Sequence, residues 1–252
     1  MRWEKKISRV LAQFPKRRPP LPEAHQRRYV SDYRDNRGGT SGVSRLVATM
    51  EGWMHRRVAT AGRGARVLEI GAGTLNHLPF EHEAECYEVV EPFHELWTDS
   101  PQRDRVGRFY DDIANIDVAR KYDRIISIAV LEHLTHLPWI LARCGLLLAD
   151  GGAFAAGIPS EGSLAWYSAW RFGTGAAYRL RTGLSYAPLM RHEHVNNAAE
   201  IEAAVRHFFR TVTRERFPLP LFHLSTYTVL VARDPDTERC RAYLDRTSGS
   251  SY

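Results

Sequence analysis

Short apolar runs alternate with stretches of helical spacing from about residue 62 onward. Runs that predict strands lie at 66–70, 86–91, 106–111, 124–128 and 153–158, and a helical pattern occupies 137–148. Strands that alternate with helices in this way predict a mostly parallel sheet with helices on both faces. Two further runs, at 211–216 and 227–232, are expected to add a final pair of strands.

Three other segments also show the helical spacing of apolar residues. Residues 43–59 repeat an apolar stripe that is typical of a helix covering a sheet. Asn196 and Asn197 precede a helical segment at 198–208 and are expected to cap it. Near the N-terminus a short basic helix carries an apolar stripe made of Trp3, Ile7, Val10, Leu11 and Phe14.

Positive charge is concentrated in an N-terminal leader, residues 1–28. Nine Lys or Arg residues stand there against two Glu residues, whereas the whole chain has a net charge of +6. Pro15 and Pro19-Pro20 end the first helix, and Lys16-Arg17-Arg18 between them is expected to be a solvated hinge. Two interpretations stay open for residues 1–18: peripheral contact with an anionic membrane, or packing on the chain's own domain or on a second subunit of a homodimer.

Composition narrows the class of protein. Hydrophobic residues make up 44% and charged residues 25% of the 252 residues, as in ordinary soluble globular proteins. No apolar run reaches the roughly 18 residues of a membrane-spanning helix, and the charged start of the chain is unlike a signal peptide. The three cysteines show no pairing or metal-ligand spacing. We expect a cytoplasmic protein. Outside the leader there is no basic stripe of the kind that binds nucleic acid, so no nucleic-acid partner is expected.

The densest chemical signal is VLEIGAGTLNHLP, residues 67–79. A buried strand runs into Gly71-Ala72-Gly73, and a helix is expected to follow. Glycine lets the backbone turn sharply and approach a ligand at the carboxyl end of a strand. Glu69, just before this turn, disfavours a bound phosphate and suits a cationic ligand with an amino-acid end.

A second carboxylate ends the next strand. Glu91 lies about 20 residues beyond the glycine turn, where an acidic side chain accepts hydrogen bonds from both hydroxyls of a ribose. A nicotinamide dehydrogenase would instead need G-x-G-x-x-G, and the sixth position of that frame is Asn76. The two carboxylates and the glycines together favour a cationic nucleoside over a dinucleotide.

Residues 66–158 resemble the class I S-adenosylmethionine-dependent methyltransferases, in their ubiquinone-biosynthesis-like branch. The matching segments are LEIGAG (68–73), VVEP (89–92), DDI (111–113), YDRIISIAVLEHL (122–134) and LLLADGGAFAAGIP (146–159). The resemblance implies a Rossmann-like α/β fold with a mostly parallel seven-stranded sheet, helices on both faces and a lid inserted after the fifth strand. The expected organisation is a leader (1–28), a methyltransferase domain (29–240) with a cofactor-binding core (62–160) and an acceptor lid (about 160–197), and a C-terminal tail (241–252).

The resemblance also implies which residues bind S-adenosylmethionine. Gly71, Ala72 and Gly73 would approach its methionine end, while Glu69 orders their loop. Glu91 would hold the ribose, and Asp112 with Ile113 would face the adenine. Ala129 would offer its backbone carbonyl to the ammonium group.

One departure from the family pattern affects this loop. Leu75 stands where many members have a third glycine, so the loop that carries the expected cofactor contact Asn76 is expected to be wider or differently placed.

On the acceptor side, His133 follows the fourth strand, where the transferring methyl group is expected. Imidazole titrates near neutrality and suits a general base; the alternative is that His133 caps the next helix or lines the pocket. The lid carries six aromatic residues that either cover the acceptor or form a satellite core: Trp166, Tyr167, Trp170, Phe172, Tyr178 and Tyr186.

The segment 190–197, MRHEHVNN, concentrates polar residues within the lid. His192 and His194 would share a face if this segment were extended, and with Glu161 they could bind a divalent metal. No second ligand pair supports this, so no metal is predicted. We expect His194 and Asn196 instead to hydrogen-bond the acceptor or the lid, with His194 and Glu161 as further catalytic candidates beside His133.

These features favour methyl transfer from S-adenosylmethionine to an oxygen of a small-molecule, sugar or glycolipid acceptor. Two alternatives remain: N-methylation of a small amine, which would call for carboxylates at the acceptor, and a cofactor-binding regulator or pseudoenzyme.

Overall fold

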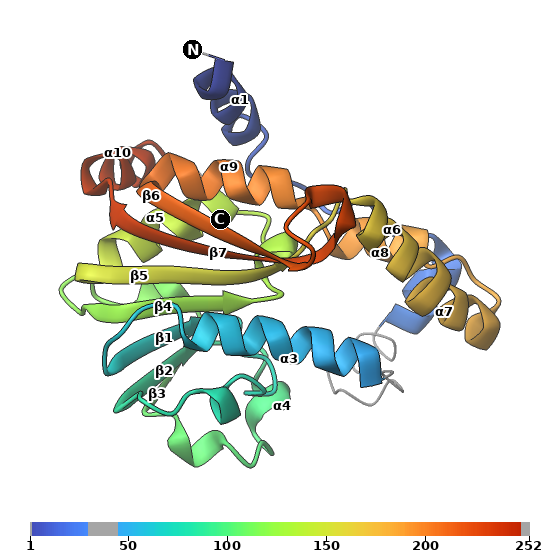
Figure 1. Ribbon diagram of the computed structural model, residues 1–252, viewed down its shortest axis with the longest axis horizontal. Helices are drawn as coiled ribbons and strands as arrows, with labels where there is room; N and C mark the ends of the chain where they lie inside the picture. Colours follow the sequence, from blue (N-terminus) through green and yellow to red (C-terminus); the bar gives the residue numbers. More distant parts are fainter. Residues whose placement is uncertain (1, 30–44, 248–252) are drawn as a thin grey trace.

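The computed structural model describes residues 2–29 and 45–247. One seven-stranded sheet has the order β3-β2-β1-β4-β5-β7-β6 (Figure 1). The strands are β1 Arg66–Ile70, β2 Cys86–Val90, β3 Arg108–Tyr110, β4 Tyr122–Ile128, β5 Leu148–Pro159, β6 Phe209–Pro218 and β7 Ser225–Pro235. Strands β1 to β5 are parallel, and β7 runs antiparallel to both β5 and β6. The predicted fold is confirmed.

Helices cover both faces of this sheet and bury its alternating apolar side chains. Helix α3 (Arg45–Ala59) packs on one face, against a layer that includes Val67 and Val89. Helices α5 (Leu137–Leu147), α9 (Ala198–Phe208) and α10 (Thr237–Thr247) pack on the other face, against a layer that includes Leu68 and Ile70. The period of two along β1 therefore sends alternate residues into two separate cores. No helix in the described part of the chain is long and apolar enough to cross a membrane.

The chain after the glycine turn departs from the expectation of a helix. Residues 74–77 form turns that lead into a short 3-10 turn, Leu78–Phe80. Leu75 is fully buried with a positive φ of 64°, and Pro79 follows within the next turn. An apolar side chain anchored in the core from a left-handed backbone position holds the chain in a turn, so the predicted helix is wrong.

A buried polar chain fixes the same loop to the sheet. His77 is fully buried; its Nδ1 lies 3.0 Å from His55 Nδ1, and its Nε2 lies 2.9 Å from Glu81 Oε1. Arg124 of β4 in turn donates two hydrogen bonds of 2.8 Å to the Glu81 carboxylate. Burial raises the pKa of Glu81, but the bonds from His77 and Arg124 outweigh it and lower that pKa below its usual value. These charge-assisted bonds hold the loop in place.

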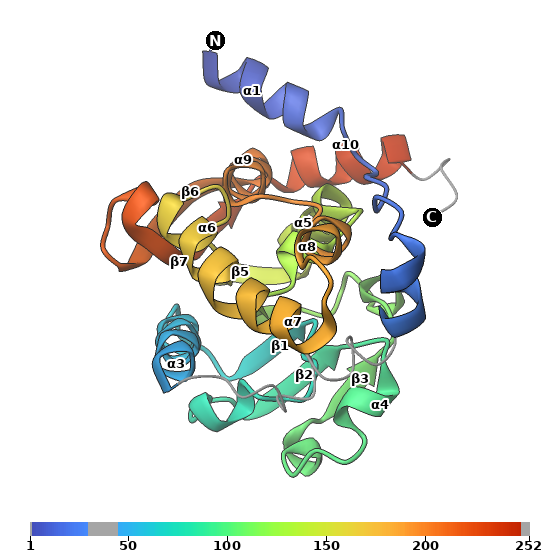
Figure 2. The same ribbon diagram turned by 90° about the vertical axis from the view of Figure 1, so that its right-hand side faces the viewer.

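Helical segments between β5 and α9 extend beyond the sheet. They are α6 (Leu164–Ala169), a π-helical turn (Trp170–Thr174), α7 (Gly175–Thr182) and α8 (Ala187–Glu193). Figure 1 shows them projecting past the end of the sheet at which β5 finishes. Figure 2 looks onto this end, with α7 and α8 in front of the strands.

The leader packs on the body of the chain. Helix α1 (Arg2–Leu11) lies against α9, Val10 is buried and Phe14 contacts the main core. Lys16 Nζ donates to the Val195 carbonyl at 2.8 Å and to Glu200 Oε2 at 2.9 Å. Lys16 is thus bonded to α9 and to the residues before it, so the expected solvated hinge is wrong for Lys16, whereas the neighbouring Arg17 is exposed.

The C-terminal boundary also differs from expectation. The residues expected as a tail from 241 onward begin inside α10, and Cys240 of that helix is fully buried against the core. Helix α4 (His94–Trp97) follows β2. The break expected at residues 38–42 and the frayed end expected at 248–251 lie outside the described residues.

Candidate active site

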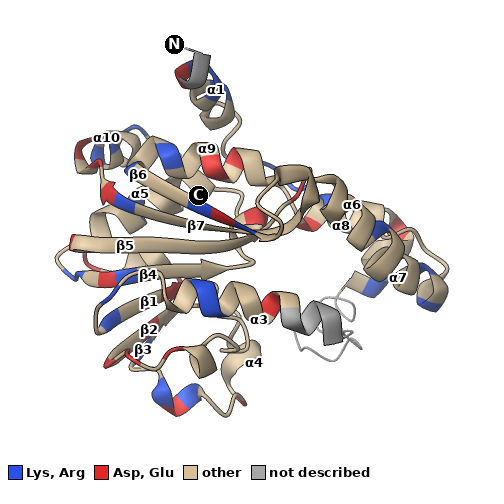
Figure 3. Ribbon diagram, viewed as in Figure 1, with Lys and Arg blue, Asp and Glu red and all other residues tan. Residues whose placement is uncertain are grey.

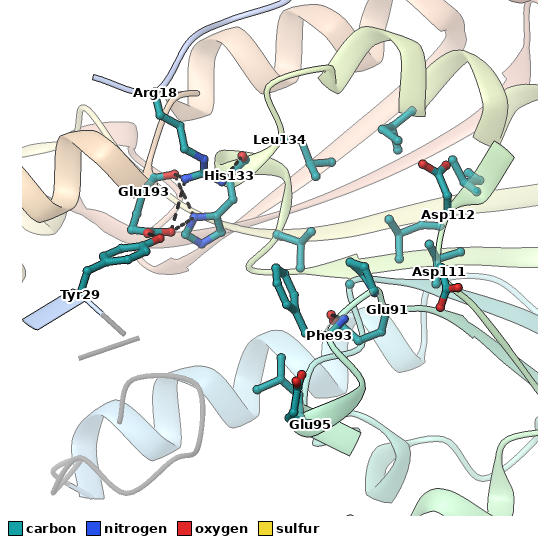
Figure 4. Close-up of a pocket in the computed structure, with 18 residues that line it drawn as sticks. Arg18, Tyr29, Glu91, Phe93, Glu95, Asp111, Asp112, His133, Leu134 and Glu193 are labelled. Carbon is teal, nitrogen blue, oxygen red and sulfur yellow. Dashed lines mark hydrogen bonds and ion pairs between the residues drawn. The ribbon is translucent and has the colours of Figure 1, made fainter. Parts of the chain in front are cut away.

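A cavity of about 620 Å³ lies at the carboxyl ends of β1 to β4 (Figure 4). Gly71, Glu91, Asp112 and Val130, which follow these four strands, form its inner wall. Its outer wall comes from segments distant in sequence, the leader and the end of α8, through Arg18, Tyr29 and Glu193. A cavity of this size suits a nucleoside-sized ligand with a small acceptor beside it.

The glycine turn reaches the cavity through a backbone that other residues would strain. Gly71 has φ +73°, and a Cβ there would lie 2.5 Å from a methyl carbon of Val130. Gly73 has φ +52°, and its N–H donates to Glu91 Oε2 at 2.8 Å. The positive φ angles therefore favour glycine at both positions, and at position 71 the close contact with Val130 also leaves no room for a side chain.

Glu91 links the ends of β1 and β2. Its side chain is 2% exposed and accepts hydrogen bonds from the Gly73 N–H and, at 3.1 Å, from the Phe93 N–H. Each carboxylate oxygen keeps a second lone pair. Glu91 is thus held in a fixed orientation with the capacity to accept two further hydrogen bonds from a ligand in the cavity.

Asp112 and Ile113 line the cavity beyond Glu91. Asp112 caps the 3-10 turn Ile113–Asn115, because its Oδ1 accepts from the Ala114 N–H at 2.7 Å. Ile113 is buried in the core below it. This part of the wall offers one apolar side chain and one carboxylate.

The other residues expected to bind the cofactor do not line the cavity: Glu69, Ala72, Gly73, Asn76 and Ala129. Glu69 points into the layer under α3, where the Tyr87 hydroxyl donates to its Oε2 at 2.6 Å. Burial raises the pKa of Glu69 to about 7, although His77 and the bond from Tyr87 oppose the shift. Asn76 is exposed on the turn. Ala129 has φ +53° and donates its N–H to the Gly157 carbonyl at 2.8 Å.

At the far end of the cavity, His133 is held by Glu193 (Figure 4). His133 Nδ1 lies 2.9 Å from the Glu193 carbonyl oxygen and 3.4 Å from its Oε2. The carbonyl can only accept, so Nδ1 carries the proton and Nε2 has the free lone pair. His133 therefore lines the cavity with a fixed tautomer.

Arg18 and Tyr29 complete this end. Arg18 donates to the carbonyls of His133 and His192 at 3.0 Å, and Tyr29 donates its hydroxyl to the Glu193 carboxylate. Burial raises the pKa of Glu193, but the hydrogen bonds from His133 and Tyr29 outweigh it and lower that pKa to about 2. Glu193 is ionised throughout the physiological range.

His194 and Glu161 lie behind His133, outside the cavity lining. Glu161 Oε2 lies 3.0 Å from His194 Nδ1, and the rings of His194 and His133 meet edge to face with centroids 4.8 Å apart. Burial lowers the pKa of His194, but the bond to Glu161 and the charge of Glu132 outweigh it and raise that pKa. The three catalytic candidates are thus adjacent, and only His133 reaches the cavity.

The extended segment that would place His192 and His194 on one face does not form. Helix α8 continues to Glu193, so the segment is not extended, and His192 Nδ1 instead lies 2.7 Å from the Pro19 carbonyl. Asn196 is also turned away from the acceptor end, because its Nδ2 donates to the carbonyls of Leu131 and Leu134 at 2.8 Å. Asn197 does cap α9, and Glu200 closes the capping box.

The lid aromatics have mixed surroundings. Tyr178 packs with Leu21 and Leu189 in a small separate core, as the satellite interpretation expects. Trp166 stacks on His194 with centroids 6.3 Å apart, whereas Tyr167 and Phe172 are exposed. None of the six aromatics lines the cavity as the described residues define it.

Sequence reasoning missed Arg18, Tyr29 and Glu193, and the reasons differ. Arg18 was assigned to a hinge because prolines flank it, and nothing in the local pattern around Tyr29 indicated a site. Glu193 was within the polar segment 190–197 that drew attention to its histidines. The signal available in the sequence was the carboxylate of Glu193 between two histidines, because a charged side chain is rarely buried for packing alone.

The cavity is acidic. Among residues 2–29 and 45–247, five carboxylates line it, those of Glu91, Glu95, Asp111, Asp112 and Glu193, against one Lys or Arg side chain, that of Arg18. Basic and acidic residues are interspersed elsewhere around the sheet, so this excess is local (Figure 3). Negative charge at this density disfavours a phosphate and favours a cationic ligand.

Comparison with known proteins gives likenesses of fold. No family model matches the chain, and no curated protein matches it in sequence. Among solved structures, the N-methyltransferase NodS from Bradyrhizobium japonicum WM9 in complex with S-adenosyl-l-homocysteine aligns over 77% of this chain and 90% of its own, with 16% identity and a TM-score of 0.51.

Two further solved structures are similar in the same range. An O-methyltransferase family protein from Burkholderia thailandensis aligns over 92% of this chain and 69% of its own, with 14% identity and a TM-score of 0.53. An S-adenosylmethionine-dependent methyltransferase from Clostridium acetobutylicum ATCC 824 aligns over 83% and 98%, with 11% identity and a TM-score of 0.52. With its strand order and these likenesses, the chain has the fold of the class I S-adenosylmethionine-dependent methyltransferases.

Proposed function

We propose that this protein is an S-adenosylmethionine-dependent methyltransferase that methylates an oxygen of a small-molecule, sugar or glycolipid acceptor. The observation that carries the proposal is the acidic cavity at the carboxyl ends of β1 to β4, with a fixed imidazole at its far end. In an open α/β sheet, ligands bind at this end of the strands.

The residues present fit the cofactor. Glu91 has two free acceptor sites for ribose hydroxyls, and Gly71 exposes backbone where a Cβ would collide with Val130. Asp112 and Ile113 offer an acceptor and an apolar surface suited to adenine. When bound, S-adenosylmethionine supplies an electrophilic methyl group on a positively charged sulfur, and the carboxylates of the cavity stabilise that charge.

His133 supports transfer to oxygen. A hydroxyl must lose its proton as it is methylated, and His133 lines the cavity with Nδ1 bonded to the Glu193 carbonyl, which leaves the Nε2 lone pair to accept that proton. The ionised Glu193 carboxylate nearby would stabilise the imidazolium that forms. Arg18 holds both residues through their carbonyl groups.

One observation favours a second candidate, N-methylation of a small amine. Glu193 places a carboxylate beside His133, and an ammonium acceptor would bind favourably next to it. Both candidates use the same cofactor site and differ in the atom that receives the methyl group.

Methyl transfer from labelled cofactor tests the proposal directly. The full-length protein is incubated with S-adenosylmethionine labelled at the methyl group and with panels of sugars, glycolipids, phenols and amines, and products are analysed by mass spectrometry and NMR. We expect label in O-methyl products. Label in N-methyl products would favour the second candidate, and tight cofactor binding without transfer to any acceptor would favour a regulator.

The cofactor site is tested with a matched pair of variants. Glu91→Gln removes the charge of a buried carboxylate that holds the ribose, and we expect S-adenosylhomocysteine to bind about 1–3 kcal/mol more weakly by calorimetry. Glu95→Gln changes an exposed carboxylate on the same cavity and should alter the affinity by less than about twofold. Equal effects of the two substitutions would contradict the assignment of Glu91.

A further inference from the structure

Three side chains with metal-binding atoms converge behind the far end of the cavity. They are Glu132 and His133, which follow β4, and His194, which follows α8. Their carboxylate oxygen and imidazole nitrogen atoms all lie within 4.8 Å of one another. The cluster combines two adjacent residues with a third that lies 61 positions beyond His133, so the fold and not a local motif creates it.

Glu132 has an oxygen that lacks a partner. The residue is 2% exposed, and its Oε2 makes no hydrogen bond with any described residue. Its backbone carbonyl accepts from the N–H groups of Val195 and Asn196, which fixes the residue against the start of α9. A buried carboxylate oxygen is costly to leave unpaired, so this position calls for a cation.

The two histidines use the same ring atom, Nδ1, to bond to the protein. His133 Nδ1 is bonded to the Glu193 carbonyl, and His194 Nδ1 is bonded to the Glu161 carboxylate. Each ring therefore carries its proton on Nδ1 and keeps a lone pair on Nε2. Metal-binding histidines are oriented in this way, with one nitrogen donating to a carbonyl or carboxylate and the other bound to the metal.

We propose that Glu132, His133 and His194 bind a divalent transition-metal ion. Two imidazole nitrogens and one carboxylate oxygen form a donor set suited to zinc, iron, cobalt or manganese, and three protein ligands leave coordination positions open. Ligand atoms about 2.1 Å from one ion lie about 3.4 Å apart in a tetrahedral site, so the widest pair of the cluster must close by up to about 1.4 Å on binding. Glu161 and Glu193 act as the positioning residues of the two imidazoles.

The site has a role in the chemistry of the cavity, and this role rests on the proposed function. His133 lines the cavity whereas Glu132 and His194 lie behind it, so the role requires an open position of the ion that faces the cavity beside the His133 ring. Coordination at that position lowers the pKa of an acceptor hydroxyl, which then loses its proton to water near neutral pH. In that arrangement the His133 Nε2 lone pair holds the ion, and the metal replaces imidazole as the group that activates the acceptor.

A metal-free arrangement of the same residues makes a different prediction. His194 could be an imidazolium that pairs with Glu161 on one side and with Glu132 on the other. In such a cluster His194 has no nitrogen lone pair for a metal ion, and Glu132 already has a cationic partner, so no specific metal binding is expected.

Cobalt titration of the metal-stripped full-length protein distinguishes the metal site from the metal-free arrangement. Co²⁺ bound to imidazole nitrogen and carboxylate oxygen gives visible absorption bands, and calorimetry with Zn²⁺ and Mn²⁺ gives affinities. We expect one site per chain. The absence of bands and of heat up to about 1 mM metal would overturn the proposal, since affinities weaker than this carry little binding free energy.

Variants locate the site. His194→Ala and Glu132→Gln should each abolish the Co²⁺ bands, and Glu132→Gln keeps the shape of the side chain in case the alanine variant fails to fold. Glu161→Gln, which changes only the partner of His194 Nδ1, should weaken binding by about 10–100-fold. His192→Ala is the matched control, because His192 is two residues away and bonds to the Pro19 carbonyl; an equal loss in this control, or unchanged bands in His194→Ala, would contradict the assignment.

The binding of S-adenosylhomocysteine is measured on the same samples. Retained affinity in metal-free protein is the expected result, because Glu91 and Asp112 lie at the other end of the cavity. Metal binding without any cofactor binding would leave the metal site standing while contradicting the proposed function. Cofactor binding without metal binding would contradict the metal site and leave the proposed function standing.

Discussion

Glu69 illustrates how burial changes the chemistry of a single residue. Its carboxyl group lies beneath α3 with the Tyr87 hydroxyl as hydrogen-bond donor, and burial raises its pKa from 4.5 to about 7. Between pH 4.5 and about pH 7 the Glu69 carboxyl group is protonated in the folded state and ionised in the unfolded state. The stability from this group is therefore fully present below pH 4.5 and is lost as the pH rises through 7.

Glu69→Gln should remove this dependence. The amide keeps an acceptor for Tyr87 and carries no charge, so the variant should gain about 1–3 kcal/mol relative to the wild type between pH 5 and pH 8. Urea unfolding at the two pH values measures the change. If variant and wild type differ in free energy of unfolding by the same amount at pH 5 and at pH 8, the raised pKa of Glu69 is contradicted.

Some residues of the site could be predicted from the sequence, and others could not. Gly71, Glu91 and His133 were recognisable because each follows a predicted strand, and strand ends of a parallel sheet meet at one edge. Asp112 was indicated by the family resemblance. Arg18 and Glu193 reach the cavity from segments 175 residues apart in the chain, which meet only through tertiary packing. No local pattern encodes such a contact.

Helix α9 shows how one element organises its surroundings. The Asn197 side chain accepts from the N–H groups of Ala199 and Glu200, and Glu200 bonds back to the Asn197 N–H. Glu200 also pairs with Lys16 of the leader. The start of α9 therefore fixes both the chain that carries His194 and the leader.

Asn197→Ala should lower the free energy of unfolding by about 1 kcal/mol, because two N–H groups of the first turn lose their acceptor. Thermal unfolding should show a midpoint about 2–4 °C lower. Asn76→Ala, at an exposed turn, is the control and should leave the midpoint unchanged. Indistinguishable midpoints for the two variants would contradict the importance of the cap.

Elements were predictable where the pattern was long and regular. All seven strands and α3, α5 and α9 lie where periodicity indicated them. The chain after Gly73 was misjudged because Leu75 and His77 are drawn into the core by partners on α3 and β4. Those partners are invisible in a local window, so the tertiary contact overrides the expectation of a helix there.

For the molecule as a whole, the leader connects the lid to the sheet. Arg18 donates to carbonyls on both sides, of His133 after β4 and of His192 in α8. Tyr29 and His25 add bonds to Glu193 and to the Ser185 carbonyl. The lid is therefore held by a segment near the N-terminus, 160 to 175 residues earlier in the chain.

Arg18→Ala should loosen this connection. Loss of the hydrogen bonds corresponds to about 0.5–1.5 kcal/mol for a partly exposed side chain, so hydrogen exchange in α8 should become about 2–10 times faster. Arg17→Ala, at the exposed neighbouring position, should not change it. Equal exchange rates in the two variants would show that other contacts hold the lid.

The order of the strands has a consequence for synthesis. Strand β7 is made last but is inserted between β5 and β6, so β5 keeps an open edge until residue 235 has left the ribosome. Open edges of apolar strands recruit other chains. A nascent or prematurely ended polypeptide that lacks β7 is thus the form of this protein most in need of a chaperone.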